Sequence, residues 1–495
     1  MLLSLDCLDL KSCLLVIFLF LLLVDFLKHR NPPEFPPGPW PLPFLGNVFI
    51  GFGYQDIDKV AEQFGNIFSL RWGGEKVVFV SGYKMVKDVL MTQGDNFLDR
   101  PASPLFSDVF KDCGISVSNG YRWRRQRQFS VAHLKHFGEG KRTLELHVQQ
   151  ECSFLCQAFQ QEMGGPFNPQ LIINSAAANG IGFLVFGKRF DYNATDFQNR
   201  LRLSQESMLL IGNPLVQLYD VFPWLFKRLP GLRSGPHVTI LSNYAKIVPF
   251  LRKEIEKHKK EWDPFDHRDY IDSYIGEIDK KKRDIEAGFH SENLVYCSLD
   301  LFEAGTETIT NTLRWALLYM VKYPDVQENV QEEIKSVIGQ SRQPCLADRV
   351  SMPYTDAVIH ETQRMANILP LNIRMSSKDA TMGGYFIPKG TKVIVNLSSV
   401  LRDQTEWETA DHFNPQHFLD VHGHFRKREA FFPFSAGKRA CLGQSLARME
   451  LFLFFTSLLQ RFTISSSPGE EPPSLEPQGV AIQSPKPFTI CASTW

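Results

Sequence analysis

One cysteine, Cys441, stands at the end of a glycine-punctuated loop that leads into a long apolar segment. The loop reads Phe431-Phe432-Pro433-Phe434-Ser435-Ala436-Gly437-Lys438-Arg439-Ala440-Cys441-Leu442-Gly443. A thiolate at a helix N-terminus is stabilised by unsatisfied N–H groups, and Gly437 and Gly443 let a large planar group approach the backbone. A nucleophilic cysteine would need a base, and the loop holds no histidine. The pattern favours a ligand over a nucleophile or a buried structural cysteine, so the fold must hold this loop against a bound group.

Composition is compatible with one large body built around such a site. The 495 residues are 43% hydrophobic and include 40 phenylalanines, which is enough for a large core and excludes wholesale disorder. Lys+Arg and Asp+Glu are equal at 54 each, so no global charge argues for nucleic acid as a partner. Nine cysteines without CxxC pairs favour a reducing compartment over a disulfide framework or structural zinc.

The N-terminus carries the most hydrophobic stretch, residues 13–24, followed by Lys28-His29-Arg30. A bilayer span needs about 20 residues, which extends the helix from Leu8 to Leu27. The positive charge follows the apolar run, the reverse of a cleaved signal peptide, and the positive-inside rule then places the body in the cytosol. Residues 1–30 are therefore predicted to be a signal anchor, in preference to a helix lying on the membrane surface.

Residues 31–46 contain a run of prolines that bars helix and predicts a stiff, extended hinge between the anchor and the body. No second linker or internal repeat follows, so residues 47–495 are predicted to be one domain. Its class is mainly α with small β-sheets, that is, α+β. Helical periodicity occurs at 144–159, 244–260, 292–323, 324–338, 354–368 and 441–462, and strand patterns at 76–81, 385–387 and 392–396.

Small and hydroxyl residues interrupt the predicted helix at 300–308, which reads Asp-Leu-Phe-Glu-Ala-Gly-Thr-Glu-Thr. Ala304 and Gly305 permit close approach of another group. A threonine hydroxyl that bonds back to a carbonyl can bend the helix and open a groove for a diatomic ligand. A helix that merely tolerates glycine at a crossing is the simpler alternative.

These segments together resemble the cytochrome P-450 haem-thiolate monooxygenases. Phe434-x-x-Gly437-x-Arg439-x-Cys441-x-Gly443 matches the haem-binding loop of that family. Further family motifs occur in order, and the likeness covers essentially the whole chain. It is strongest to subfamily J of microsomal family 2, whose members include arachidonate epoxygenases, through Phe302–Met320, Pro353–Asn372 and Arg428–Phe462. The additional motifs are Trp123-x-x-x-Arg127, Glu361-x-x-Arg364 and Pro415-x-x-Phe418.

The resemblance implies the cytochrome P-450 fold and heme b, with Cys441 as the axial ligand of the iron. Trp123 and Arg127 lie one helical turn apart, which suits two donors to one propionate. The segment before Arg374 is one residue shorter than in relatives, so the pocket lip there is expected to differ. The remaining haem-binding candidates by the same matching are Arg100, Arg374, Phe434 and Arg439.

Glu307 and Thr308 match the acid–alcohol pair that relays protons in the family. Two positions depart from it. Ile309 stands where Thr or Ser is usual, and Glu303 stands where a small or apolar residue is usual. Glu303 is one turn before Glu307, so it either raises a carboxyl pKa by like-charge coupling or faces water. By resemblance, Val117, Ala304, Ile373 and Ala481 border the substrate, and Glu361, Arg364 and His417 form a structural group that supports the Cys441 loop.

The predicted function is insertion of one atom of O2 into a lipophilic substrate at the endoplasmic reticulum membrane. Electrons come from NADPH–cytochrome P-450 reductase, with cytochrome b5 as a further partner. Polyunsaturated fatty acids such as arachidonate are favoured over xenobiotics. A haem-thiolate peroxide isomerase and a non-catalytic haem or gas sensor are the alternatives. The apolar residues of 213–226 predict either core or a second contact with the bilayer.

Overall fold

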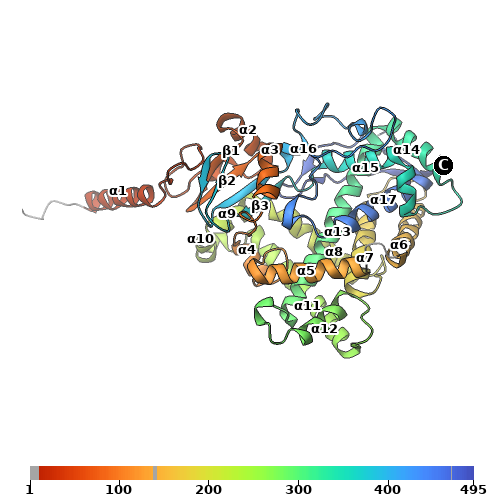
Figure 1. Cartoon of the computed structure of the whole chain (residues 1–495), viewed down its shortest axis with the longest axis horizontal. Coiled ribbons are helices and arrows are strands. Elements are labelled where there is room, and N and C mark those ends of the chain that lie inside the picture. The colour runs from red at the N-terminus through yellow and green to blue at the C-terminus, as the bar shows by residue number, and fades with distance from the viewer. Residues whose placement is uncertain (1–9, 138–141, 470) are drawn as a thin grey trace, which may run out of the picture.

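Helices fill most of the molecule, and a small sheet lies at the end from which the first helix projects (Figure 1). The computed structural model describes residues 10–137, 142–469 and 471–495. Leu8 and Asp9, part of the predicted span, lie outside the described residues. The mainly α class with small sheets is confirmed.

The helices are α1 (Leu10–Lys28), α2 (Tyr54–Phe64), α3 (Tyr83–Lys87), α4 (Pro104–Phe110), α5 (Gly120–Phe137), α6 (Arg142–Gln161), α7 (Gln170–Phe186), α8 (Thr195–Ile211), α9 (Pro214–Val221), α10 (Pro223–Arg228), α11 (Pro236–Glu261), α12 (Tyr270–Lys280), α13 (Ser291–Lys322), α14 (Pro324–Val337), α15 (Pro353–Ala366), α16 (Ser398–Leu401) and α17 (Gln444–Arg461). The strands are β1 (Ile67–Trp72), β2 (Glu75–Val80), β3 (Leu371–Met375), β4 (Ala380–Met382), β5 (Tyr385–Ile387), β6 (Lys392–Asn396), β7 (Phe462–Ser465), β8 (Pro477–Gln478), β9 (Ser484–Pro485) and β10 (Cys491–Thr494).

The main sheet joins distant parts of the chain in the order β1-β2-β6-β3. Its β2–β6 pair is parallel, with Val78 opposite Val393, and its other pairs are antiparallel. The continuous valine and isoleucine pattern of β2 and β6 suits strands buried on both faces. The sheet therefore fixes β3, which carries Arg374, relative to the N-terminal part of the body.

α13 is the central helix, and most of its 32 residues are buried. It packs against α7, α11, α15 and α17. The predicted helix 292–323 corresponds to α13. The prediction that a helix starts at Cys441 is wrong by three residues. α17 begins at Gln444 after Gly443, and Cys441 belongs to the loop before it.

The anchor helix is joined to the body at its C-terminal end. α1 is the one helix among the described residues that is long and apolar enough to cross a membrane. Its Asp25 is buried and accepts hydrogen bonds from Arg71 Nη1 at 3.0 Å and from the Phe44 backbone N–H at 3.2 Å. The proline-rich segment that follows lies along β1, because Ser69 donates its N–H to Pro37 and its hydroxyl to Pro36. Both contacts hold α1 close to β1.

A buried ionic group joins α15 to the segment before the Cys441 loop. Arg364 Nε and Nη2 donate to the two carboxylate oxygens of Glu361 at 2.8 and 2.7 Å. His417 Nδ1 lies 3.2 Å from both oxygens. Arg364 also donates to backbone carbonyls within residues 401–412. The structure thus brings together the three residues predicted to form a structural group.

Replacing Glu361 by glutamine is expected to lower the free energy of unfolding by about 3–5 kcal/mol, because it leaves the buried Arg364 cation uncompensated. The matched control is Glu408→Gln. Glu408 is largely exposed and pairs with Arg428 at 3.0 Å, so its loss should cost below about 1 kcal/mol. Urea unfolding followed by circular dichroism measures both. Equal effects of the two changes would contradict the structural role.

Candidate functional site

The Cys441 loop is held by specific backbone contacts. The Cys441 N–H donates to Phe434 O at 3.0 Å, and Arg127 Nη2 on α5 donates to Ala440 O at 2.6 Å. Gly437 has φ +73°, and a Cβ there would lie 1.8 Å from Leu90 O, so no other residue fits without displacing backbone. The loop is therefore fixed in position before anything binds to it.

The Cys441 side chain is exposed, whereas the other cysteines are buried or half-buried in the described part of the chain. Its surroundings are nevertheless mostly protein, and burial raises the pKa of the Cys441 thiol. A hydrogen bond from the Gly443 N–H and the charge of Arg127 act in the opposite direction. The Gly443 N–H and the Arg127 cation both favour the thiolate form. An accessible sulfur in this form is suited to bind a metal.

α13 has one accessible patch in an otherwise buried stretch. Ala304 is exposed, and Gly305 and Thr308 are half-buried. Thr308 Oγ1 donates to Ala304 O at 2.7 Å, the back-bonding predicted from the sequence. Gly305 lies at the crossing with α7, where a Cβ would come within 2.8 Å of Ile181, so Ala304 and Thr308 are the accessible residues that leave room for a bound group.

Four arginines converge without an ion-pair partner among the described residues. They are Arg100, Arg127, Arg374 and Arg439. Burial and the positive charges of the other three lower the pKa of Arg374 to about 8. Burial, with Arg100 and Arg127, lowers the pKa of Arg439 to about 9. Arg374 and Arg439 are buried and Arg100 and Arg127 are half-buried, and a cluster of cations in such a place is unstable unless an anion balances it.

Individual contacts of this cluster show how much of it is available to a ligand. Arg374 Nη1 is buried and has no hydrogen-bond partner, and its Nη2 is 3.5 Å from Ser435 Oγ. Arg439 is tied to Leu98 and Ser118 carbonyls at 2.9 and 2.7 Å and lies 4.0 Å over the Trp123 ring. Arg374 is therefore the arginine with the most unused hydrogen-bonding capacity.

These features together fit haem. An accessible thiol, an unfilled space beside small residues and an unbalanced group of four guanidinium ions match an iron porphyrin with two propionates. Cys441 would hold the iron, and Arg100, Arg127, Arg374 and Arg439 would hold the propionates. Trp123 and Phe434 support the arginines and the loop.

The predicted substrate residues do not all line one cavity. Val117 and Arg100 line a cavity of about 450 Å³ together with Phe106. Ile373 on β3 is 42% exposed. Ala481 lies elsewhere, against the end of α8, since a Cβ on Gly212 would come within 2.8 Å of its backbone nitrogen.

Glu303 does not face water, so that alternative is wrong. It is 5% exposed, and Tyr244 Oη on α11 donates to its Oε2 at 3.2 Å. Burial raises the pKa of Glu307 to about 8, and the charge of Glu303 adds to this effect. The like-charge coupling predicted from the sequence is therefore present, but burial dominates it.

The sequence did not point to Tyr244, nor to Asp300, which fixes the loop before α5. Asp300 accepts hydrogen bonds from the N–H groups of Ile115 and Ser116 and from the Ser116 hydroxyl, at 2.5–3.0 Å. No local pattern reveals either role, because each depends on contacts between segments far apart in the chain.

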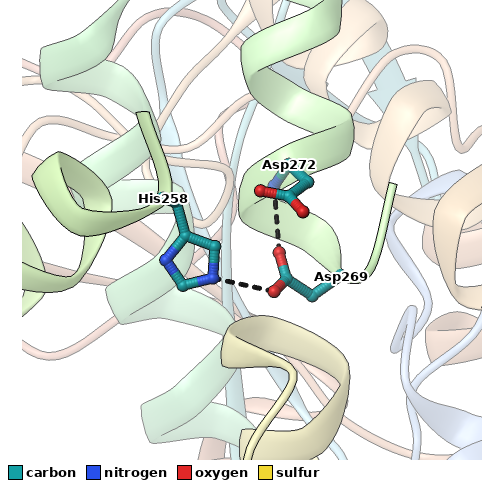
Figure 2. A group of neighbouring side chains, drawn as sticks. All are labelled: His258, Asp269 and Asp272. Carbon is teal, nitrogen blue, oxygen red and sulfur yellow. Dashed lines mark hydrogen bonds and ion pairs between the residues drawn. The ribbon is translucent and has the colours of Figure 1, made fainter. Parts of the chain in front are cut away.

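His258, Asp269 and Asp272 form a second cluster of metal-ligand type at the α11–α12 corner (Figure 2). Its atoms are already hydrogen bonded. His258 donates from Nε2 to Asp269 at 2.8 Å and from Nδ1 to Glu254 O at 2.8 Å. Asp269 caps α12 through the Asp272 N–H, and Arg268 neutralises Asp272 at 2.6 Å. The cluster is a structural ion pair, and the guanidinium beside it disfavours a metal ion.

The fold and the cysteine site together define a haem-thiolate enzyme. The cytochrome P450 family model matches residues 36–492, and the chain belongs to this family. It is 48% identical to human (Homo sapiens) cytochrome P450 2J2 over 487 residues, covering 97% of this chain and 96% of that protein. It is 46% identical to rabbit (Oryctolagus cuniculus) cytochrome P450 2J1, with 97% and 96% coverage, and 44% identical to hamster (Mesocricetus auratus) cytochrome P450 2D20, with 96% and 96%. The chain is a haem-dependent monooxygenase, which uses O2, a substrate and a redox partner.

Replacing Arg374 by methionine is expected to have opposite effects on the two forms of the protein. In the haem-free protein, the change removes a guanidinium that the three other arginines repel and that has an unsatisfied hydrogen-bond donor. The free energy of unfolding should therefore rise by about 1–3 kcal/mol. With haem it removes a propionate partner, so haem should dissociate faster. The measurements are unfolding of the haem-free protein and haem transfer to a scavenger. Arg364→Met, which breaks a complete ion pair, should destabilise both forms. A destabilised haem-free Arg374→Met protein would contradict the unbalanced-cation interpretation.

The His258–Asp269 pair predicts a pH-dependent stability. Burial lowers the pKa of His258, but the hydrogen bond and charge of Asp269 outweigh it, and the net pKa lies above 6.5. A histidine whose pKa is higher in the folded state than in the unfolded state stabilises the protein at pH values below its unfolded-state pKa. This stabilisation is lost as the pH rises through the folded-state pKa. The stability difference between wild type and His258→Gln should therefore be larger at about pH 6 than at about pH 8.5. His424→Gln, at an exposed position, is the control. A difference that grows with pH would contradict this assignment.

Proposed function

We propose that this monooxygenase epoxidises and hydroxylates polyunsaturated fatty acids such as arachidonate, and oxidises xenobiotics as a second substrate class. The observation that carries the haem-thiolate chemistry is the accessible Cys441 thiol within a body that also holds four unbalanced arginines. The cavity beside Arg100 has Val117 and Phe106 among mostly polar lining residues, so the proposal of a lipophilic substrate rests on the family resemblance. The resemblance to subfamily J favours fatty acids.

Haem, when bound, supplies the activation of O2 and the transfer of one oxygen atom. Cys441 holds the iron as a thiolate, with the Gly443 N–H directed at the sulfur. Ala304 is exposed on α13 and would leave room for the bound group. Val117 would contact the substrate from the cavity beside Arg100, whereas Ile373 and Ala481 lie outside that cavity. The Thr308 hydroxyl donates a hydrogen bond to Ala304 O. The lone pairs of the hydroxyl oxygen are therefore free to accept a proton that originates at Glu307.

We propose that electrons arrive from NADPH through cytochrome P450 reductase, with cytochrome b5 as an additional donor. Arg124 is exposed and Arg125 half-buried on α5, the helix whose Arg127 contacts the Cys441 loop. Cations on this helix would attract an acidic partner to the side of the molecule nearest the thiolate.

The membrane arrangement we propose places the anchor in the endoplasmic reticulum membrane and the body on the cytosolic side. α9 and α10 lie on the same side of the body as α1 (Figure 1), and the β1–β2 turn at Gly73 touches Val221 and Phe222 between them. Trp224 on α10 is 59% exposed and Trp40 is 90% exposed. These apolar side chains support a second contact with the bilayer, through which lipophilic substrates could enter.

The carbon monoxide difference spectrum of the reduced protein tests the central claim. The expected result is the red-shifted Soret band of thiolate-ligated haem, and its loss in Cys441→Ser but not in Cys491→Ser, whose cysteine is buried elsewhere. A spectrum of nitrogen-ligated haem in the wild type would overturn the assignment of Cys441.

Product analysis with arachidonate separates the monooxygenase from a peroxide isomerase. With reductase and NADPH, Thr308→Ala should lower product formed per NADPH consumed by about 100-fold, because the direct proton donor is lost. Thr306→Ala is the control, since Thr306 is buried and bonds to Phe302 O. Full turnover of a peroxide substrate without NADPH would favour the isomerase. Absence of any turnover would favour a sensor.

A further inference from the structure

Ionisable residues form a stripe along one buried face of α13. Asp300, Glu303, Glu307 and Arg314 are spaced by three, four and seven residues, which places them on the same side of the helix. Thr308 and Ala304 lie on the neighbouring face. Asp300 and Arg314 are engaged elsewhere, with the loop at Ser116 and with Pro485 O at 3.1 Å. Glu303 and Glu307 are the two members that these structural contacts do not account for.

Glu303 lies where three helices meet. Tyr244 of α11 donates to its carboxyl group at 3.2 Å, and Ser204 of α8 also hydrogen bonds to it. Burial raises the pKa of Glu303 to about 7, although both hydrogen bonds oppose the shift, and the charge of Asp300 adds to it. The carboxyl group can therefore gain and lose a proton near neutral pH. Burying a carboxyl group costs more free energy than burying an apolar side chain of similar size. Holding α13 against α11 therefore does not by itself explain why a carboxyl group stands here.

Glu307 is one turn further along and has an incomplete set of partners. Its Oε1 is buried without a hydrogen bond. Side chains four residues apart on a helix have Cβ atoms about 5–6 Å apart, a gap that one water molecule can bridge. A buried unsatisfied oxygen is the kind of atom that such a water satisfies. A water bound to Glu307 Oε1 would connect it to the carboxyl group of Glu303 one turn away.

Tyr244 connects Glu303 to a second cavity. A space of about 610 Å³ lies between α4, α9, α10 and α11 and is lined by Tyr244, Tyr296, Lys227 and Arg233. It is separate from the cavity that holds Val117. The Tyr244 side chain lines this largely apolar cavity, and its hydroxyl is hydrogen bonded to the Glu303 carboxyl group. Tyr244 therefore lies between the cavity and Glu303.

We propose that Tyr244 and Glu303 supply protons to Glu307 by a path that enters from the cavity beside α11. This inference rests on the proposed role of Glu307 and Thr308. Glu303 acts through Glu307 and is a positioning residue rather than a catalytic one. When Glu307 passes its proton to Thr308, Glu303 gives its own proton to Glu307 through the bridging water. Tyr244 gives one to Glu303 and takes one from cavity water. Tyr244, Glu303 and Glu307 regain their starting states, and the cavity water is left as hydroxide that exchanges with bulk water. Thr308 holds the proton to pass on, and nothing is oxidised or reduced.

Infrared spectroscopy of the haem-loaded protein tests the path without turnover. A protonated buried carboxyl group gives a C=O stretching band that shifts in D2O. Wild type should show the band near neutral pH, Glu303→Gln should lose a component of it, and Tyr244→Phe should shift that component. Tyr296→Phe, which removes another tyrosine hydroxyl from the same cavity, should leave it unchanged. A spectrum of Glu303→Gln identical to wild type would overturn the proposal.

Coupling measurements with reductase and NADPH give the functional readout. Glu303→Gln keeps the shape of the side chain and its capacity to accept hydrogen bonds but removes the acidic proton. We expect the product formed per NADPH to fall about 5- to 10-fold, less than the roughly 100-fold expected when a direct proton donor is lost, with hydrogen peroxide rising in its place. Tyr244→Phe should show the same trend, Glu303→Asp should recover most of the coupling, and Tyr296→Phe should equal wild type.

Different results would overturn the proposed function and the proton path. If wild type forms no product with reductase and NADPH, the proposed function is wrong. If wild type turns over and Glu303→Gln couples equally well, Glu303 is only a tether and the path is wrong. Each variant is first checked for the thiolate carbon monoxide band. Should Glu303→Gln fail to retain haem, Tyr244→Phe against Tyr296→Phe decides the matter, and equal coupling of those two overturns the proposal.

Discussion

The site depends on unbalanced positive charge that the protein holds in its interior. Arg100, Arg127, Arg374 and Arg439 come from four separated parts of the chain, and the described residues provide no carboxylate to pair with them. A protein folded for stability alone would not keep a buried guanidinium such as Arg374 with an unsatisfied donor. The cluster makes sense only with a bound dianion. The main sheet, α5 and the Cys441 loop all serve to hold its members in place.

α13 carries two functions on adjacent faces. The face with Ala304 and Thr308 is accessible, while the face with Glu303 and Glu307 is closed by α8 and α11, and α7 packs closely at Gly305. Closing the second face is what raises the pKa values of both carboxyl groups, because burial penalises the charged form. Proton chemistry and space for a ligand are thus provided by one helix without competing for the same side chains.

The N-terminal region links the membrane to this interior through packing. Asp25 near the end of the apolar helix binds Arg71 of β1, and β1 belongs to the sheet that also contains β3 and Arg374. The anchor is therefore joined to the same sheet that supports the haem-binding arginines. The apolar surface of α9 and α10 lies next to this sheet, which brings the side of the molecule suited to lipid close to the cavities.

Local sequence patterns were enough to assign the class of protein. The spacing around Cys441, the helical periodicities and the Glu361–Arg364 and Trp123–Arg127 pairs are local patterns, because a ligand loop and a helix face are set by residues close together in the chain. The sequence could say that Glu303 was unusual but could not say whether it faced water. Only the tertiary structure decided that, since the burial of Glu303 depends on Tyr244, 59 residues away. It also decided that Cys441 precedes its helix and that four distant arginines meet with no carboxylate in ion-pair contact among the described residues. Contacts between distant segments, and the pKa values that follow from them, arise only once the chain has folded.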